Sequence, residues 1–116
     1  MAGKITVSTI NDSSGVLATQ NGMTGIAKAW VVFTGSTGAI TGSFNVGSIT
    51  RNGTGDYTIN FTTAMPNATY SAFMTVSDLR IPQPTVYATG SVRMNNYSTG
   101  GSLSDSTYVN VSVQSS

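Results

Sequence analysis

A chain of 116 residues with a net charge of +1 and 8% charged residues is large enough for one domain and lacks the basic stripe typical of nucleic-acid binding. It contains no histidine, cysteine or glutamate, which excludes disulfides, thiolate metal sites and histidine-based catalytic triads. Serine and threonine make up about thirty per cent of the residues and leucine occurs only three times, so the composition predicts strands and turns rather than helices.

The first 22 residues are predicted to form an extended N-terminal arm, distinct from a β-sandwich domain over residues 23–116. Residues 4–10 alternate in polarity, with Ile5 and Val7 on one side. Such a segment has little partner sequence nearby, so it pairs with an edge of its own sheet or with another subunit. We take Ile5, Val7 and Ile10 as candidate anchors to another protein.

The domain begins with its most apolar segment, a strand predicted over residues 27–33. Apolar residues on both faces of this strand indicate burial on two sides, and Trp30 is interpreted as a packing residue. The next predicted strand places Ile40, Phe44 and Val46 on one face, with Gly42 at a bend or bulge.

A hairpin follows, because Asn52-Gly53 tolerates the positive φ of a tight turn. The predicted turn joins a short strand over residues 47–50 to a strand over residues 57–61. The second strand alternates, which indicates one buried face and assigns Tyr57 to the core.

The remaining segments are also strands separated by turns. Residues 70–76 carry apolar residues on both faces, and residues 108–113 alternate cleanly. Pro82 and Pro84 confine their segment to a sheet edge or to a position outside the sheet. About eight short strands with Gly- and Asn-rich turns predict an all-β fold, a small antiparallel sandwich or barrel.

Catalysis by a pair of aspartates, as in glycosidases, is still open to a chain without histidine, cysteine and glutamate. The four aspartates lie in turn-like contexts, so we interpret them as turn residues that bond their own backbone. The oxygen-rich triplets at 11–13 and 104–106 lack the spaced carboxylates of a calcium loop. We therefore expect no catalytic residues, no metal and no cofactor.

Aromatic rings offer a different chemistry, because they can stack on sugars. Tyr97 lies in a predicted asparagine-rich loop at 95–102, close in sequence to Arg93 and Asn95. These three residues are the candidate ligand contact.

Several stretches together resemble a small β domain of tailed-bacteriophage virion proteins, found in fibre-like proteins and as short stand-alone products. These stretches are AKAWVVF (27–33), GSFNVGSIT (42–50), NGTGDYTINF (52–61) and TTAMPNATY (62–70), with the opening ITVSTINDSSG (5–15). The similarity extends from Lys4 to about Tyr70.

The resemblance implies a non-enzymatic structural protein of the virion, a self-associating trimeric module of the tail-fibre or fibre-tip type. The implied partners are copies of itself, a virion protein held through the arm, and a host-surface polysaccharide. The alternative is a capsid decoration protein that stabilises the head lattice, which the small size favours. An enzyme acting on polysaccharide or requiring calcium is a third hypothesis. No membrane insertion is expected, because the longest apolar run covers only residues 29–33.

Overall fold

The computed structural model describes residues 9–11, 16–18 and 27–115, which form strands and turns with no helix. The strands of the arm are β1 (Thr9–Asn11) and β2 (Val16–Ala18). Four body strands, which make the first sheet, are β3 (Ala27–Phe33), β4 (Ile40–Phe44), β7 (Ser71–Val76) and β10 (Val109–Gln114). The four strands of the second sheet are β5 (Val46–Gly53), β6 (Asp56–Phe61), β8 (Ile81–Tyr87) and β9 (Ser91–Tyr97).

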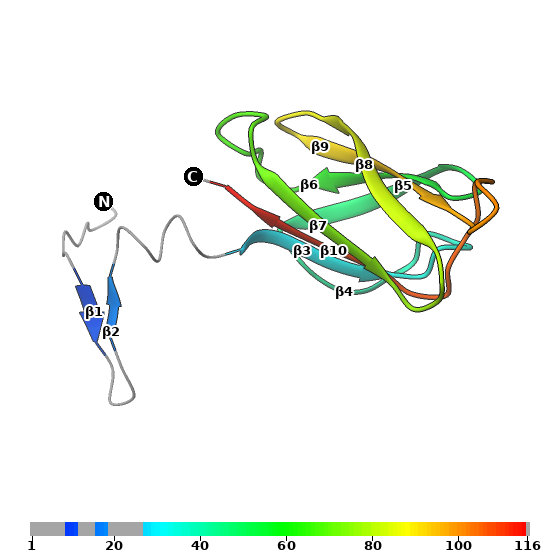
Figure 1. Ribbon diagram of the computed structural model, residues 1–116. Helices are drawn as coiled ribbons and strands as arrows, with labels where there is room; N and C mark the ends of the chain where they lie inside the picture. The colour runs from blue at the N-terminus through cyan, green and yellow to red at the C-terminus, as the bar shows by residue number, and fades with distance from the viewer. Residues whose placement is uncertain (1–8, 12–15, 19–26, 116) are drawn as a thin grey trace.

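Both sheets are antiparallel (Figure 1). The first sheet has the order β4-β3-β10-β7 and the second has the order β5-β6-β9-β8. The last strand of the chain, β10, therefore lies between β3 and β7 in the first sheet. The predicted all-β fold of about eight strands in the domain is confirmed.

One hydrophobic core lies between the two sheets, which makes the body a β-sandwich rather than a barrel. Its members come from the inward faces of both sheets and include Val31, Phe33, Ile59, Val92, Met94 and Val111. The ring of Phe33 in the first sheet meets the ring of Tyr57 in the second edge-on, with centroids 5.1 Å apart. This geometry is favoured by aromatic pairs, and it joins the two layers.

Strand β3 is buried on one face only. Ala29, Val31 and Phe33 are buried, whereas Trp30 between them is 42% exposed. The prediction that this strand is buried on both sides is wrong. The core lies on one side of the first sheet, and no described segment covers the other side.

The chain crosses from the first sheet to the second at Asn45. This residue has a positive φ of 56°, and its Nδ2 donates hydrogen bonds of 3.0 Å to the carbonyls of Lys28 and Thr63. The turn separates its two neighbours, so that Phe44 is exposed and Val46 is buried. The prediction that Phe44 and Val46 share one face is wrong. Their alternating spacing looks like that of one strand, but the chain changes sheets between them.

The predicted hairpin is present, but its turn lies at 54–55 and not at Asn52-Gly53. Gly55 has a φ of +65°, and a Cβ there would lie 2.5 Å from the backbone nitrogen of Ser104 and 2.6 Å from the Asn96 carbonyl oxygen. Glycine is therefore required at position 55 both for its backbone conformation and for the close approach of another segment.

Two local predictions about the edges of the sheets are confirmed. The segment with Pro82 and Pro84 forms β8, which is an edge strand. The bulge expected near Gly42 appears as a register shift in the β3–β4 pairing, between Val32 and Phe33. The predicted anchors Ile5 and Val7 lie outside the described residues, and Ile10 is placed in β1 opposite Leu17.

A glycine-to-alanine series tests the requirement at the turn. We expect Gly55→Ala to lower the free energy of unfolding by more than about 3 kcal/mol, from backbone strain and steric clash together. Gly101 has a φ of +89° and no atom within 4 Å of where a Cβ would lie. Gly101→Ala should therefore lower the free energy of unfolding by about 1 kcal/mol, from backbone strain alone. Gly53→Ala should be nearly neutral, since Gly53 has neither feature. Urea denaturation measures all three, and equal effects at positions 55 and 101 would contradict the role of close packing.

Candidate functional site

A row of aromatic side chains crosses the outward surface of the first sheet. Strand pairing sets Phe44 opposite Trp30, and Trp30 opposite Ser112. Ser112 is in turn opposite Phe73 on β7. The three rings are all exposed, at 55% for Phe44, 42% for Trp30 and 57% for Phe73. We call the outward surface that contains Phe44, Trp30, Ser112 and Phe73 the aromatic face.

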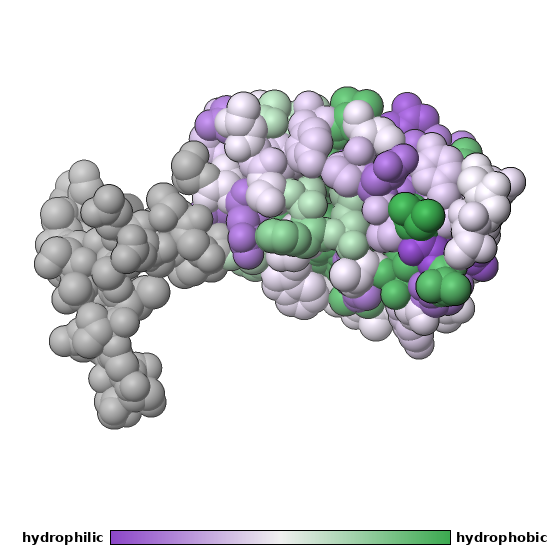
Figure 2. Space-filling view, viewed as in Figure 1, coloured by the Kyte–Doolittle hydropathy of each residue, from purple (hydrophilic) through white to green (hydrophobic). Residues whose placement is uncertain are grey.

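A shallow groove of ≈ 280 Å³ lies between Trp30 and Phe73, over strand β10. Ser112 and Asn110 belong to its lining, and Asn110 Nδ2 donates a hydrogen bond of 3.3 Å to Thr75 Oγ1. Most of the exposed lining is carbon. In Figure 2, hydrophobic residues (green) occur over the part of the body where Figure 1 places β7.

The aromatic face is nearly free of charge. Lys28 is the single charged residue in the four strands of the first sheet. An exposed apolar surface with few charges is typical of sites that bind another molecule, because isolated monomers rarely leave extended apolar area in water. The interpretation of Trp30 as a packing residue of the core is therefore wrong.

Local sequence carried part of this signal. Trp30 alternates with the buried Ala29 and Val31 and shares its face with Lys28, which is a local sign that this face is outward. The apolar residues that follow Lys28 outweighed that sign in the prediction. Phe73 likewise shares its face with the polar residues Ser71 and Thr75, a signal that the prediction did not use.

The outward surface of the second sheet has a different character, made of amides and hydroxyls. Asn60 Nδ2 donates hydrogen bonds to Ser48 Oγ at 3.1 Å and to Thr50 Oγ1 at 3.0 Å. Asn52 Nδ2 donates one of 2.9 Å to Thr58 Oγ1 on the neighbouring strand. We call this surface the polar face.

The three predicted ligand contacts lie on β9, and the expected loop at 95–102 is wrong for its first three residues. Arg93, Asn95 and Tyr97 alternate with the buried residues Val92, Met94 and Asn96, so the structure brings the three to the polar face. Continued pairing with β6 and β8 extends the strand into the stretch that looked like a turn.

Arg93 is held by a carboxylate on the adjacent strand. Its Nε donates to Asp56 Oδ1 at 2.9 Å and its Nη2 to Asp56 Oδ2 at 2.7 Å. The hydrogen bond from Arg93 is the main reason that the pKa of Asp56 lies below its ordinary value. Asn95 and Tyr97 are the two neutral members of the predicted contact.

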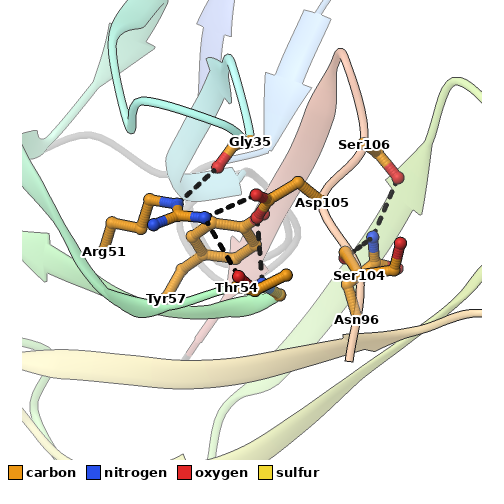
Figure 3. Close-up of polar contacts among 9 residues, drawn as sticks. Gly35, Arg51, Thr54, Tyr57, Asn96, Ser104, Asp105 and Ser106 are labelled. Carbon is orange, nitrogen blue, oxygen red and sulfur yellow. Dashed lines mark hydrogen bonds and ion pairs between the residues drawn. The ribbon is translucent and has the colours of Figure 1, made fainter. Parts of the chain in front are cut away.

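A second polar cluster forms at one end of the sandwich, around Asp105 (Figure 3). The Asp105 carboxylate accepts hydrogen bonds from Arg51 Nη2 at 2.5 Å, Tyr57 Oη at 2.5 Å and the Gly55 backbone N–H at 2.9 Å. Arg51 Nε also donates to the Gly35 carbonyl at 3.3 Å. The carboxylate therefore ties the hairpin turn to the loop that precedes β10.

These contacts change two pKa values. Partial burial raises the pKa of Asp105, but the hydrogen bonds from Arg51, Tyr57 and the Gly55 N–H outweigh it and hold the pKa below its ordinary value. Burial, together with the hydrogen bond to Asp105, raises the pKa of the Tyr57 hydroxyl above its ordinary value. Both shifts favour a charged carboxylate beside a neutral phenol. This pair forms a stable hydrogen bond that holds the two segments together.

The described aspartates make long-range contacts. Asp56 and Asp105 form ion pairs with distant arginines, and Asp78 pairs with Arg80 at 3.0 Å and accepts a hydrogen bond from Ser106 Oγ. The prediction that these residues bond mainly their own backbone is wrong, because their carboxylates bond side chains that the fold brings close. Arg80 is the exception, since it lies two residues from Asp78 in the chain.

Asn96 is a buried polar residue that sequence reasoning placed in a loop. Its Nδ2 donates to the Ser104 carbonyl at 3.0 Å and to Ser106 Oγ at 2.8 Å. Its backbone pairs with Gly55 and Ser104. Figure 3 shows it beside the Asp105 cluster, where it fixes the same loop from the other side.

Within residues 9–11, 16–18 and 27–115, no three His, Cys, Asp or Glu side chains are grouped so as to hold a metal ion. The same residues contain no helix with the length and apolarity that crossing a bilayer requires. Comparisons of the chain with protein-family models, with curated proteins and with solved structures find no match. The aromatic face is the candidate functional site on structural grounds alone.

The Asp105 cluster predicts a specific response to acid. Because the folded pKa of Asp105 is lowered, its contribution to stability is complete above the unfolded pKa of about 4 and is lost as the pH falls through the folded pKa. Asp105→Asn should lower the free energy of unfolding by about 1–3 kcal/mol at pH 7, and it should lose less stability than the wild type on acidification to about pH 2. Tyr57→Phe keeps the carboxylate and should keep most of the pH dependence. Urea denaturation across this range measures both, and parallel curves for wild type and Asp105→Asn would contradict the assignment.

Proposed function

We propose that the chain is a non-enzymatic structural protein of a tailed-bacteriophage virion, and that it works by associating with copies of itself on the particle surface. The observation that carries the proposal is the row of exposed rings on the aromatic face. Trp30, Phe44 and Phe73 project from a sheet with a single charged residue.

The composition of the aromatic face favours a protein partner. Interface cores are enriched in tryptophan and phenylalanine and depleted of charged residues, as this surface is. Burying three half-exposed rings removes apolar area from water, which is the dominant favourable contribution to association. A second copy of the chain carries the same apolar surface, so it is a matching partner.

The state of the carboxylates supports a structural role. Asp56, Asp78 and Asp105 are each engaged in an ion pair with an arginine. A carboxylate that acts as an acid or base near neutral pH needs a raised pKa, whereas the pKa values of Asp56 and Asp105 are lowered.

The virion assignment is supported by the resemblance of residues 4–70 to small β domains of phage virion proteins. We propose a trimer of the fibre or fibre-tip type, in which three aromatic faces meet around the common axis. In this arrangement the arm, with Ile5, Val7 and Ile10, contacts another virion protein. A capsid decoration protein is the alternative, and both use the same self-associating surface.

A host-surface polysaccharide is a further proposed ligand, at the polar face. Neutral amides and hydroxyls there match the hydroxyl groups of sugars, and Asn95 and Tyr97 are the proposed contacts. Arg93 contributes by holding Asp56 rather than by direct contact.

Loss of rings from the aromatic face should weaken self-association. We expect the Trp30→Ser/Phe44→Ser variant, which leaves β7 unchanged, to raise the dissociation constant by roughly 30-fold or more, equivalent to about 2 kcal/mol, because large aromatic residues dominate interface energies. Sedimentation equilibrium over a range of concentrations measures the change. Leu79→Ser is the matched control, since Leu79 is 84% exposed but lies outside the first sheet. A wild-type protein that remains monomeric at high concentration, or a double variant that associates as well as the wild type, would overturn self-association by this face.

Copy number in purified particles tests the virion role. Quantitative mass spectrometry should find this chain in the phage particle at a fixed ratio to the major capsid protein. A low copy number of about a dozen is expected for a fibre protein, and hundreds would assign the alternative decoration role. Absence from purified particles would overturn both.

A further inference from the structure

The sandwich has four edge strands, β4 and β7 in the first sheet and β5 and β8 in the second. An edge strand presents unpaired N–H and C=O groups, which can pair with a strand of another chain. Proteins prevent such pairing with prolines, charged residues, bulges or very short strands. The four edges of this molecule differ in these features.

Three edges carry at least one protective feature. β8 contains Pro82 and Pro84 and has a register shift after Pro84. β5 contains Arg51 and has two register shifts in its pairing with β6. β4 has five residues, and its pairing with β3 is broken by a register shift.

β7 carries none of these features. Its six residues, Ser71–Val76, include no proline, no glycine and no charged residue. Its pairing with β10 runs without a register shift from one end to the other. It is therefore a regular strand with one unprotected edge.

The backbone groups on this edge can be assigned from the ladder. Ser77 N–H donates to the Tyr108 carbonyl at 3.1 Å, and the same register continues as Val76 opposite Val109. Because hydrogen-bonded and non-hydrogen-bonded pairs alternate in an antiparallel ladder, residues 71, 73 and 75 bond to β10. Ala72, Met74 and Val76 direct their N–H and C=O groups to the free edge. Within the described residues, no hydrogen bond to these outward groups is formed.

The inward side chains of β7 are also incompletely covered. Ala72, Met74 and Val76 pack against the core but remain half-buried. Their neighbours on β10, Val111 and Val113, are exposed by only 3% and 1%. An added strand would complete the burial of this edge as well as its hydrogen bonds.

We propose that β7 pairs antiparallel with β7 of a second copy, about a two-fold axis at Met74. This register sets Met74 opposite Met74 and Ala72 opposite Val76. All three residues of each strand whose backbone groups point to the free edge then form hydrogen bonds, about six in total. It goes beyond the proposed function, because it uses a sheet edge and does not require the aromatic face.

The sequence of β7 favours a second copy as the occupant. In the proposed register Phe73 lies opposite Thr75 of the other copy, an aromatic–β-branched pair that stabilises sheets. The strand has no charge, so the two-fold axis brings no like charges together. The two first sheets, of four strands each, become one continuous sheet with both aromatic faces on the same side.

Disulfide trapping tests the register, and the absence of cysteine from the chain makes the experiment clean. Phe73→Cys and Thr75→Cys are made as separate variants in a Trp30→Ser background, which weakens association through the aromatic face. In the proposed register positions 73 and 75 form a non-hydrogen-bonded pair with Cα atoms about 4.5 Å apart, which a disulfide can bridge. We expect a mixture of the two variants, one carrying a mass tag, to give at least tenfold more disulfide-linked heterodimer than a mixture of Phe73→Cys with Thr85→Cys on the protected edge β8.

Each single variant alone is a second control. Positions 73 and 73 of the two copies are diagonal neighbours about 7–8 Å apart, too far for a disulfide, so the separate variants should link little. Ala72→Pro, which removes an outward N–H donor without touching the β10 ladder, should reduce linking in the mixture.

Three outcomes would overturn the proposal. If the mixture of Phe73→Cys and Thr75→Cys gives no more linked dimer than the mixture with Thr85→Cys, the β7 edges do not pair. If Phe73→Cys alone gives as much linked dimer as the mixture, the proposed register is wrong. Stronger linking of Phe73→Cys to an Ile5→Cys variant assigns the edge to the arm instead. Failure here with the aromatic-face association intact leaves the proposed function standing, because that association is measured in protein with native β7.

Discussion

The contact on which the rest of the structure depends joins Tyr57 to Asp105. The ring of Tyr57 fills the core against Phe33, and its hydroxyl donates to the carboxylate of Asp105. Asp105 belongs to the loop that carries the chain from β9 at the second sheet to β10 in the middle of the first. By holding that loop and the Gly55 turn together, the contact sets where β10 begins, and therefore where Ser112 lies between the two rings of the groove.

The sheets differ on their outward sides, and this difference organises the molecule more than any single residue does. One outward surface carries aromatic rings at cross-strand paired positions, whereas the other carries amides and hydroxyls that bond to one another across strands. Inward positions on both sheets are apolar. The molecule therefore has three kinds of surface: an apolar core, a side with exposed rings, and a side on which amides and hydroxyls face water.

Features set by neighbours in sequence could be predicted, and those set by distant neighbours could not. The alternation of Tyr57 and Ile59 and the two prolines of β8 act locally, so a strand with one buried face and an edge strand were both foreseen. The insertion of β10 between β3 and β7 brings Trp30 beside Ser112, a contact that no local pattern contains. The aspartates were misjudged for the same reason, because Arg51 and Asp105 are far apart in the chain. For Trp30 the one local sign of an outward position is Lys28 on the same face of the strand, and the apolar residues around it obscured that sign.

Trp30 is the one tryptophan of the chain, and it is partly exposed on the aromatic face. Its indole packs on Gly42, where a Cβ on the glycine would be 3.5 Å from the ring. The ring therefore contacts the sheet at Gly42 and is partly exposed to solvent. The tryptophan fluorescence of the protein therefore originates at this surface alone. A shift of the emission maximum to shorter wavelength, or loss of quenching by a small solute, would report coverage of the indole without any added label.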